Sequence, residues 1–174
     1  AFNVTLPTPI SFALGTATTK VREKCMDVLS VIEAGLGGTP FTGVTVLCGA
    51  TFWKQLIEHA ALKETVVNWQ AAQTLRADPR LSIDFGGLRF LRYRGTSAVK
   101  VQDGEAWAIP TGVSGLFITR FAPANYMETV NTVGLPYYAK AEVMPFQKGV
   151  QLEAQSNPLN LCTRPASIVK LTAA

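Results

Sequence analysis

Metal-binding and redox side chains are scarce in this sequence. It contains one histidine, His59, and three cysteines, Cys25, Cys48 and Cys162, with no C-x-x-C pair. A lone histidine without a cysteine or carboxylate cluster excludes most metal sites, and we predict it to be a surface or helix-terminal residue. Widely spaced cysteines in apolar surroundings predict buried free thiols in a reducing compartment. We therefore expect no metal and no cofactor.

Motifs typical of catalysis are also missing. No G-x-S-x-G elbow supplies a nucleophile. The glycine-rich residues 35–43 follow a predicted helix and lack the Gly-Lys-Ser/Thr of a phosphate-binding loop. None of the 12 acidic residues stands in an apolar, pocket-like context, so we expect no catalytic residue and no enzyme. A small hydrolase stays open as an alternative, which two converging acids in a deep pocket would support.

Long apolar runs and a strong net charge are absent too. A charged residue interrupts every candidate membrane span, and the first residues lack the basic leader of a signal peptide. With 48% apolar and 16% charged residues, the 174-residue chain has the composition of a folded protein. Its net charge of +4 permits nucleic acid nearby but is too small to indicate a sequence reader.

Helical periodicity is concentrated in the first half of the chain. Apolar residues at spacings of three and four predict an amphipathic helix over 18–36, capped by Thr18 or Thr19 and closed by glycines. The apolar run 43–49 predicts a buried strand that leads directly into a helix over 50–58. We expect a further helix over 64–75.

Alternating apolar and polar residues dominate from residue 82 onward. Residues 82–94 predict a hairpin, because Gly86 and Gly87 separate two alternating arms and both accept a positive φ. Further strands are expected over residues 2–6, 98–101, 105–110, 116–122, 137–145, 150–155, 160–162 and 167–171. Helices that come early and strands that come late predict an α+β fold.

Three arginines lie on the outgoing arm of the predicted hairpin. Alternation places Arg92 and Arg94 on one face and Arg89 on the other, with Tyr93 between them. Arginines interleaved with aromatic residues are typical of surfaces that follow phosphates, so a nucleic-acid-binding module is an alternative function. We favour a solvated strand that forms salt bridges with other subunits.

Several longer strings resemble one protein family. They are TTKVREKCMDVLSVIEAGLGGTPFTGVTVLCGATFWKQLIEHAALKETVVNW, FGGLRFLRYRG, FITRFAPANYMETVNTVGLPYYAK and LEAQSNPLNLCTRPASIVKL. In number and order they resemble the lambda-type major capsid proteins of tailed phages, the capsid protein E family. The strings cover most of the chain between residues 18 and 171, and none is a catalytic signature.

This resemblance implies the Hong Kong 97-like capsid fold. It predicts a connecting segment of the peripheral domain over 1–17, an axial domain over 18–135 and a return to the peripheral domain over 136–174. Compared with complete members, the sequence is expected to lack the N-terminal arm, the extended E-loop and the long spine helix.

The resemblance also implies a function and partners. The protein would be a structural subunit of an icosahedral shell, made in the bacterial cytoplasm and located in the virion. It would bind other copies of itself in hexamers and pentamers, as well as scaffold, portal and possible decoration proteins, and would enclose DNA without contacting a membrane. The candidate assembly contacts are Arg80, Arg89, Arg92, Arg94, Thr111 and Val113.

Overall fold

The chain divides into two units. The computed structural model describes residues 5–67, 82–96 and 99–174. One unit, which we call the sheet unit, comprises Ala1–Ser114 and Arg164–Ala174, and the other, the ribbon unit, comprises Gly115–Thr163. These boundaries do not coincide with the domain boundaries predicted at residues 17/18 and 135/136. The assignment of axial and peripheral domains therefore stays a prediction.

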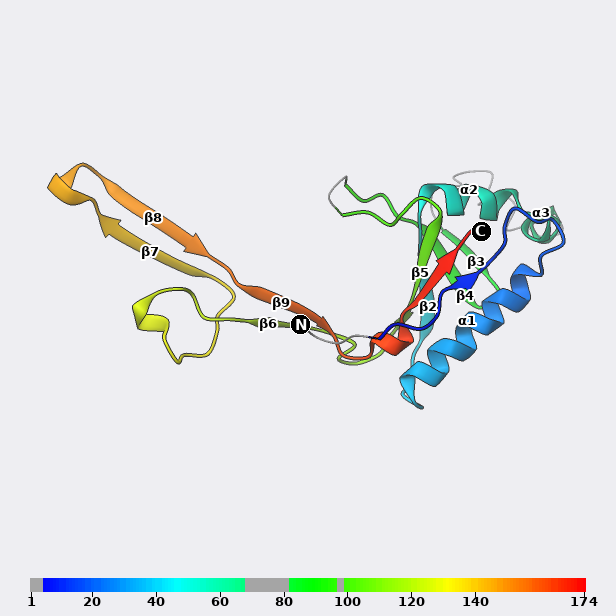
Figure 1. Ribbon diagram of the computed structural model, residues 1–174, viewed down its shortest axis with the longest axis horizontal. Coiled ribbons are helices and arrows are strands. Elements are labelled where there is room, and N and C mark those ends of the chain that lie inside the picture. The colour runs from blue at the N-terminus through cyan, green and yellow to red at the C-terminus, as the bar shows by residue number, and fades with distance from the viewer. Residues whose placement is uncertain (1–4, 68–81, 97–98) are drawn as a thin grey trace. The chain divides into compact units, whose positions relative to one another are not determined.

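A six-stranded mixed sheet organises the sheet unit (Figure 1). Its strands are β1 (Ile10–Ser11), β2 (Gly43–Cys48), β3 (Ser82–Phe85), β4 (Leu88–Arg92), β5 (Glu105–Thr111) and β10 (Val169–Thr172). They are arranged in the order β1-β10-β5-β2-β4-β3. The β1–β10 and β2–β4 pairs are parallel and the others are antiparallel, so strands distant in sequence lie side by side.

One face of this sheet forms the core. In β2, Val44, Val46 and Cys48 are buried while the residues between them are half-buried, as expected from side chains that alternate between two faces. The register places Phe90 of β4 and Ala108 of β5 on either side of Val46. The helices α1 (Val21–Leu36) and α2 (Ala50–Glu58) contribute their apolar sides to the same core.

The two ends of α1 test the predicted capping residues. Its N-cap is Lys20, which makes no capping hydrogen bond through its side chain. The prediction of Thr18 or Thr19 as the cap was wrong, since the Thr19 hydroxyl donates instead to the Ala13 carbonyl at 2.9 Å. At the other end, Gly37 adopts a left-handed conformation with φ of 59° and closes the helix as predicted.

Residues 164–167 hold the C-terminal end of α1. The Arg164 guanidinium donates to the Leu36 carbonyl at 2.7 Å and also to the Thr39 hydroxyl, so it satisfies a carbonyl that the helix leaves free. A short 3-10 helix, η3 (Pro165–Ser167), packs against α1. A Cβ on Gly35 would lie 2.4 Å from the Ala166 carbonyl oxygen, which explains the glycine at this position.

The predicted hairpin between β3 and β4 is confirmed. Gly86 and Gly87 have φ of 60° and 81°, and Ile83 pairs with Phe90 across the two arms. The turn packs against α1, because a Cβ on Gly86 would approach the Cys25 Cβ to 2.7 Å. The predicted strand 43–49 and helix 50–58 are likewise confirmed as β2 and α2.

His59 terminates α2 and is buried, with 4% of its surface exposed. Its Nδ1 accepts a hydrogen bond from the Ala61 amide at 3.3 Å, and its Nε2 lies 3.1 Å from the Thr16 carbonyl oxygen. The helix-terminal position was predicted correctly, but a surface position was not. Through these two hydrogen bonds His59 joins α2 and α3 (Ala60–Val67) to the segment before α1. The rest of the helix predicted over 64–75 lies outside the described residues.

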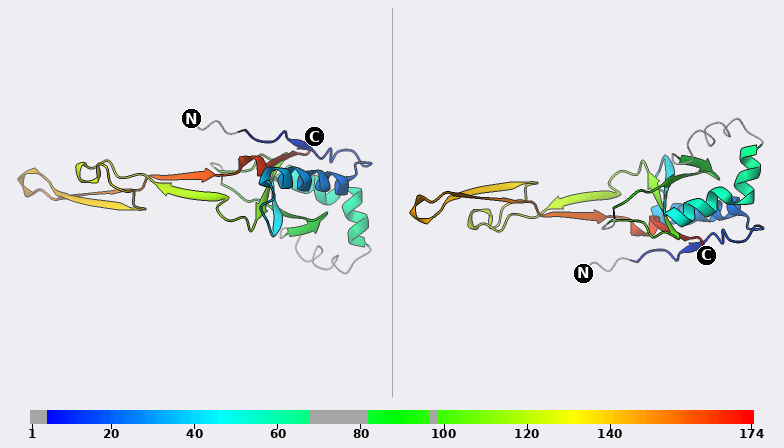
Figure 2. Two further views of the ribbon diagram at one scale, coloured as in Figure 1. Left: turned by 90° about the horizontal axis from the view of Figure 1, so that it is seen from below. Right: turned by 90° about the horizontal axis from the view of Figure 1, so that it is seen from above.

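The ribbon unit consists of two separate pairs of antiparallel strands. The pairs are β6 (Phe117–Phe121) with β9 (Pro158–Cys162), and β7 (Tyr138–Val143) with β8 (Val150–Gln155). Two short 3-10 helices, η1 (Met127–Thr129) and η2 (Pro145–Gln147), lie in the connections. In two further views, β7 and β8 form a thin ribbon with η2 at its tip (Figure 2).

Most of the late strands were predicted, and the α+β class is confirmed. The strand expected over 98–101 is wrong in its described part, because residues 99–101 form no strand. Of the short strand expected over 2–6, residues 5 and 6 are not in a strand and the others lie outside the described residues.

Candidate assembly surfaces

The predicted arginine group does not form one patch. Along β4, Leu88 and Phe90 are buried on the core face of the sheet, and Arg89 points to the opposite face. Because side chains alternate along a strand, Arg92 lies on the same face as Leu88 and Phe90. Arg92 lies at the end of β4 and lines a shallow depression beside α2, whereas Arg94 follows the strand and is exposed. The structure therefore separates Arg89 from Arg92, as alternation predicted. Arg80 lies outside the described residues.

The other two candidates, Thr111 and Val113, make contacts within the sheet unit. The Thr111 hydroxyl donates to the Gly43 carbonyl at 3.0 Å, and the Thr111 carbonyl accepts from the Thr42 hydroxyl at 3.1 Å. Val113 is half-buried and packs against the core. Thr111 therefore connects the end of β5 to the start of β2. A role of the six candidates in assembly stays a prediction.

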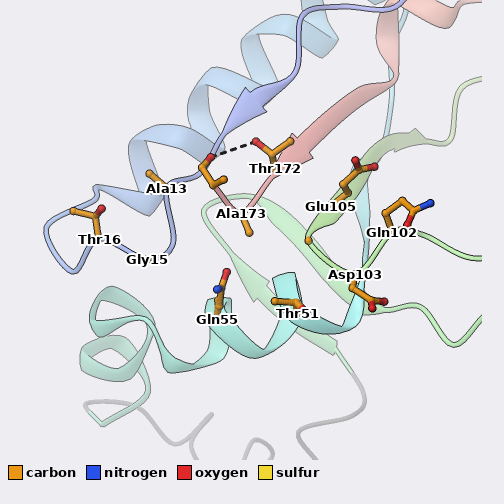
Figure 3. A pocket seen from close by; sticks show the side chains of 12 residues that line it. Ala13, Gly15, Thr16, Thr51, Gln55, Gln102, Asp103, Glu105, Thr172 and Ala173 are labelled. Atoms are coloured by element: carbon orange, nitrogen blue, oxygen red, sulfur yellow. Dashed lines mark hydrogen bonds between the residues drawn. The ribbon is translucent and has the colours of Figure 1, made fainter.

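An open depression of about 860 Å³ lies in the sheet unit (Figure 3). Residues 13–16, α2, the turn before β5 and the last residues of the chain line it. Two acids, Asp103 and Glu105, are on its rim, and their side chains point in opposite directions (Figure 3). The Glu105 carboxylate is paired with the Lys170 ammonium at 2.7 Å. The converging acids that the hydrolase alternative requires are therefore not found in this depression.

The cysteines are in the states that the sequence predicted, with one difference. Cys25 and Cys48 are fully buried free thiols, and Cys162 is also a free thiol but is half-buried. Burial raises the pKa of the Cys25 thiol to about 12 and also raises the pKa of Cys48, so both stay protonated near neutral pH. Over the described residues, no three histidine, cysteine or acidic side chains form a potential metal site.

Exposed apolar side chains are concentrated in the ribbon unit. Among the described residues, those with the largest exposed fractions there are Phe146 (90%), Met127 (88%), Val133 (87%), Tyr137 (81%) and Leu152 (77%). Only Leu116 and Ala124 of this unit belong to the buried apolar residues. Apolar surface of this extent on one segment is typical of an interaction site.

The β7–β8 hairpin has one wholly apolar face. The register pairs Ala139 with Ala154, Ala141 with Leu152 and Val143 with Val150, and residues paired in this way share a face. We call these six residues the apolar face of the hairpin, and all six are exposed. The opposite face carries the pairs Tyr138–Gln155, Lys140–Glu153 and Glu142–Gln151.

The ribbon unit covers part of the polar face with its own chain. The Lys140 ammonium is 2.7 Å from the Glu128 carboxylate and 5.3 Å from the centre of the Tyr126 ring. This hydrogen bond raises the pKa of Lys140 and lowers that of Glu128. The backbone N–H of Asn125 also donates to the Gln155 Oε1 at 2.9 Å. The loop that contains η1 is therefore held on the polar face, and the apolar face stays open.

Sequence reasoning missed this surface, although a signal for it was present. Segments 137–145 and 150–155 were correctly predicted as extended. Within them Ala139, Ala141 and Val143 alternate with Lys140 and Glu142, and the second strand repeats the pattern. An amphipathic hairpin with no other strand beside it predicts a contact surface, whereas the candidate contacts predicted from the sequence were mainly arginines.

Comparison with known proteins identifies similar sequences. The pattern of the family described as phage major capsid protein E matches residues 1–173. The major capsid protein of Pseudomonas phage KPP10 is 30% identical over 188 residues, which cover 95% of this chain and 52% of the relative. The chain thus spans about half the length of this curated relative.

One solved structure shows the same fold. A prophage protein of Escherichia coli CFT073, described as a capsid protein, superposes with a TM-score of 0.57 at 14% identity, covering 95% of this chain and 52% of that one. A phage-related protein of Bordetella bronchiseptica RB50 gives a TM-score of 0.47 at 9% identity, with 95% and 56% covered.

Proposed function

Because this chain belongs to the phage major capsid protein E family, we propose that it is a structural subunit of a phage or prophage capsid. The observation that carries this proposal is the family match over residues 1–173. The exposed apolar surface of the ribbon unit supports it, since shell subunits need surfaces that are buried only between copies.

The finer parts of the proposal concern fold and partners. We assign the chain to the Hong Kong 97-like capsid fold, in which copies form hexamers and pentamers around packaged DNA. Its partners are then other copies of itself together with scaffold, portal and possible decoration proteins. Its place is the virion, after synthesis in the host cytoplasm. No helix among the described residues is long and apolar enough to cross a membrane.

The chemistry of such a subunit is association, not a reaction. A ring or shell closes only if the rotation between neighbouring copies fits, so the shape of each contact surface is the functional property. Many modest contacts allow a shell to rearrange without losing subunits. The sheet unit has its own core, which makes it suitable as the rigid part of such a subunit.

The nucleic-acid alternative gains no support from the comparisons, since the curated relative that they name is a major capsid protein. The structure also separates Arg89 from Arg92 on opposite faces of β4. A binding assay distinguishes the two functions. Strong, salt-sensitive DNA binding that is lost in Arg92→Ala and Arg94→Ala would support the alternative.

Electron microscopy tests the proposed function. The protein should be produced both as this chain and from the longest reading frame that contains it, with a scaffold protein supplied. We expect closed shells or rings of capsomers from at least one of the two. A monomer from both at high concentration would contradict a capsid role.

A further inference from the structure

We propose that the apolar face of the β7–β8 hairpin stacks on the same face of a second copy, with the tip of each hairpin over the base of the other. The inference rests on the proposed function, because it requires the protein to associate with copies of itself. Three features of the hairpin support it: the gradient in side-chain size, the balance of charge and the area of the face.

The apolar face changes in size along its length. Ala139 and Ala154 form its base, Ala141 and Leu152 its centre, and Val143 and Val150 the end next to the tip. If a second copy is turned tip to base, both valine residues of one copy lie over alanine residues of the other. Large side chains then meet small ones at both ends of the face, which is how well-packed surfaces interdigitate.

The alternative orientation, tip to tip, packs less evenly. It would place Val143 against Val150 at one end and leave Ala139 opposite Ala154 at the other, where small side chains leave a gap. A gap forfeits dispersion contacts on both sides. In the tip-to-base arrangement Leu152 lies next to the symmetry axis, so the two copies of this residue are neighbours.

Charge does not oppose contact between two copies. The apolar face carries no ionisable group, and the hairpin from Tyr138 to Gln155 contains two lysines and two glutamates, which gives a net charge of zero. Lys140 is already paired with Glu128 on the opposite face. Stacking therefore desolvates no charge and brings no like charges together across the contact.

The area of the face indicates a weak contact. Six-residue strands about 20 Å long, in a ribbon about 10 Å wide, give a total of about 400 Å² for two stacked faces. Stable specific interfaces bury at least about 1,200 Å². The hairpin stack alone therefore does not hold two copies together, and we expect it in assembled particles, where other contacts add to it.

Chemical cross-linking tests this arrangement. In a Cys162→Ser background, Leu152→Cys is assembled and treated near pH 7 with a short bis-maleimide, since stacked sheets about 10 Å apart are too distant for a disulfide. The buried, protonated thiols of Cys25 and Cys48 stay unreacted. We expect covalent dimers from Leu152→Cys, and at least tenfold fewer from Gln151→Cys and Glu153→Cys, whose side chains are on the polar face.

A second pair of variants fixes the orientation. Ala139→Cys and Val143→Cys should give dimers when mixed before assembly and few when assembled separately. Ala141→Cys, in the same central row as Leu152, replaces Leu152→Cys if the latter fails to fold by circular dichroism.

The outcomes separate this inference from the proposed function. Particles that form normally but give no dimers through residues 152 or 141 overturn the stack and leave the capsid function intact. Equal dimers from residues 151, 152 and 153 also overturn it, because they indicate random encounters. If position 152 resists a monofunctional maleimide yet forms no dimers, another segment covers the face and the stack is wrong. Dimers without any particles support the stack and count against the capsid function.

Discussion

The sheet unit and the ribbon unit show two ways in which one chain treats its apolar residues. In the sheet unit, alternate residues of β2, β4, β5 and β10 combine with α1 and α2 to close a core. In the ribbon unit, each sheet has only two strands, and most large apolar side chains are exposed. An isolated two-stranded ribbon is marginally stable in water, so the ribbon unit needs additional contacts to become rigid. The comparison supports the proposal that folding completes one unit and assembly completes the other.

The largest expected difference concerns two phenylalanines. Phe90 is fully buried, and Phe90→Ala should lower the free energy of unfolding by about 3–5 kcal/mol because it leaves a cavity in the core. Phe146 at the hairpin tip is 90% exposed, and Phe146→Ala should change the free energy of unfolding by less than about 0.5 kcal/mol. Urea unfolding of the unassembled chain measures both. Similar losses from the two variants would contradict the division into a self-sufficient and a dependent unit.

A smaller effect is expected at the junction of β2 and α2. A Cβ on Gly49 would lie 2.0 Å from the Gln102 carbonyl oxygen, so Gly49→Ala must displace backbone and should destabilise the chain by about 1–3 kcal/mol. At Gly104 a Cβ would meet nothing within 4 Å, which makes Gly104→Ala the matched control. Thermal unfolding should separate the two variants by several degrees. An equal melting temperature would mean that the turn before β5 adapts freely.

Alkaline pH should weaken the sheet unit through its buried thiols. Burial raises the pKa of Cys25 from 9.0 to about 12. Below pH 9 the thiol is neutral in both states and contributes no pH dependence. Between pH 9 and 12 the unfolded chain loses this proton while the folded chain keeps it, so stability falls by up to about 1.4 kcal/mol per pH unit.

Unfolding at pH 8 and pH 10.5 checks this sign. Cys25→Ala should show a shallower loss of stability than the unmodified protein, whereas Cys162→Ala, which alters a half-buried thiol, should not. Identical pH dependences in all three proteins would show that Cys25 does not titrate as its burial requires.

The smallest effect is expected from the arginines of β4. Arg89 and Arg92 are exposed, and changing either to alanine should alter the free energy of unfolding by less than about 0.5 kcal/mol. If the arginines have no role in binding nucleic acid, retention on immobilised DNA should also be unchanged at physiological salt. A large drop in retention would support the nucleic-acid alternative.

The sequence predicted local structure well because the spacing of apolar residues depends on whether a segment is a helix or a strand. The helix over 18–36, the strand over 43–49 and the Gly86–Gly87 turn follow from spacing and from backbone freedom, and the structure confirms them within a few residues. The order of strands in the sheet could not be predicted, since β1 pairs with β10 from the opposite end of the chain. The hydrogen bond from Arg164 to the end of α1 could not be predicted either, because the two partners are far apart in the sequence.

The candidate surface was predicted less well than the fold. Alternation correctly separated Arg89 from Arg92, but the charge of the arginines is a stronger signal in the sequence than the alanines and valines of the hairpin. A face built partly from Ala139, Ala141 and Ala154 has a modest hydrophobicity when read along the sequence. It becomes recognisable only when the register pairs it with Leu152 and Val150.

Hydrogen exchange measured on the free chain and on assembled particles tests the central claim most directly, namely that assembly completes the ribbon unit. Amides of β2, β5 and β10 should exchange slowly in both states, because they belong to a closed core. Amides of Tyr138–Val143 and Val150–Gln155 should exchange rapidly in the free chain and slow down at least tenfold in particles. Equally slow exchange of these strands in the free chain, or no slowing on assembly, would contradict the account.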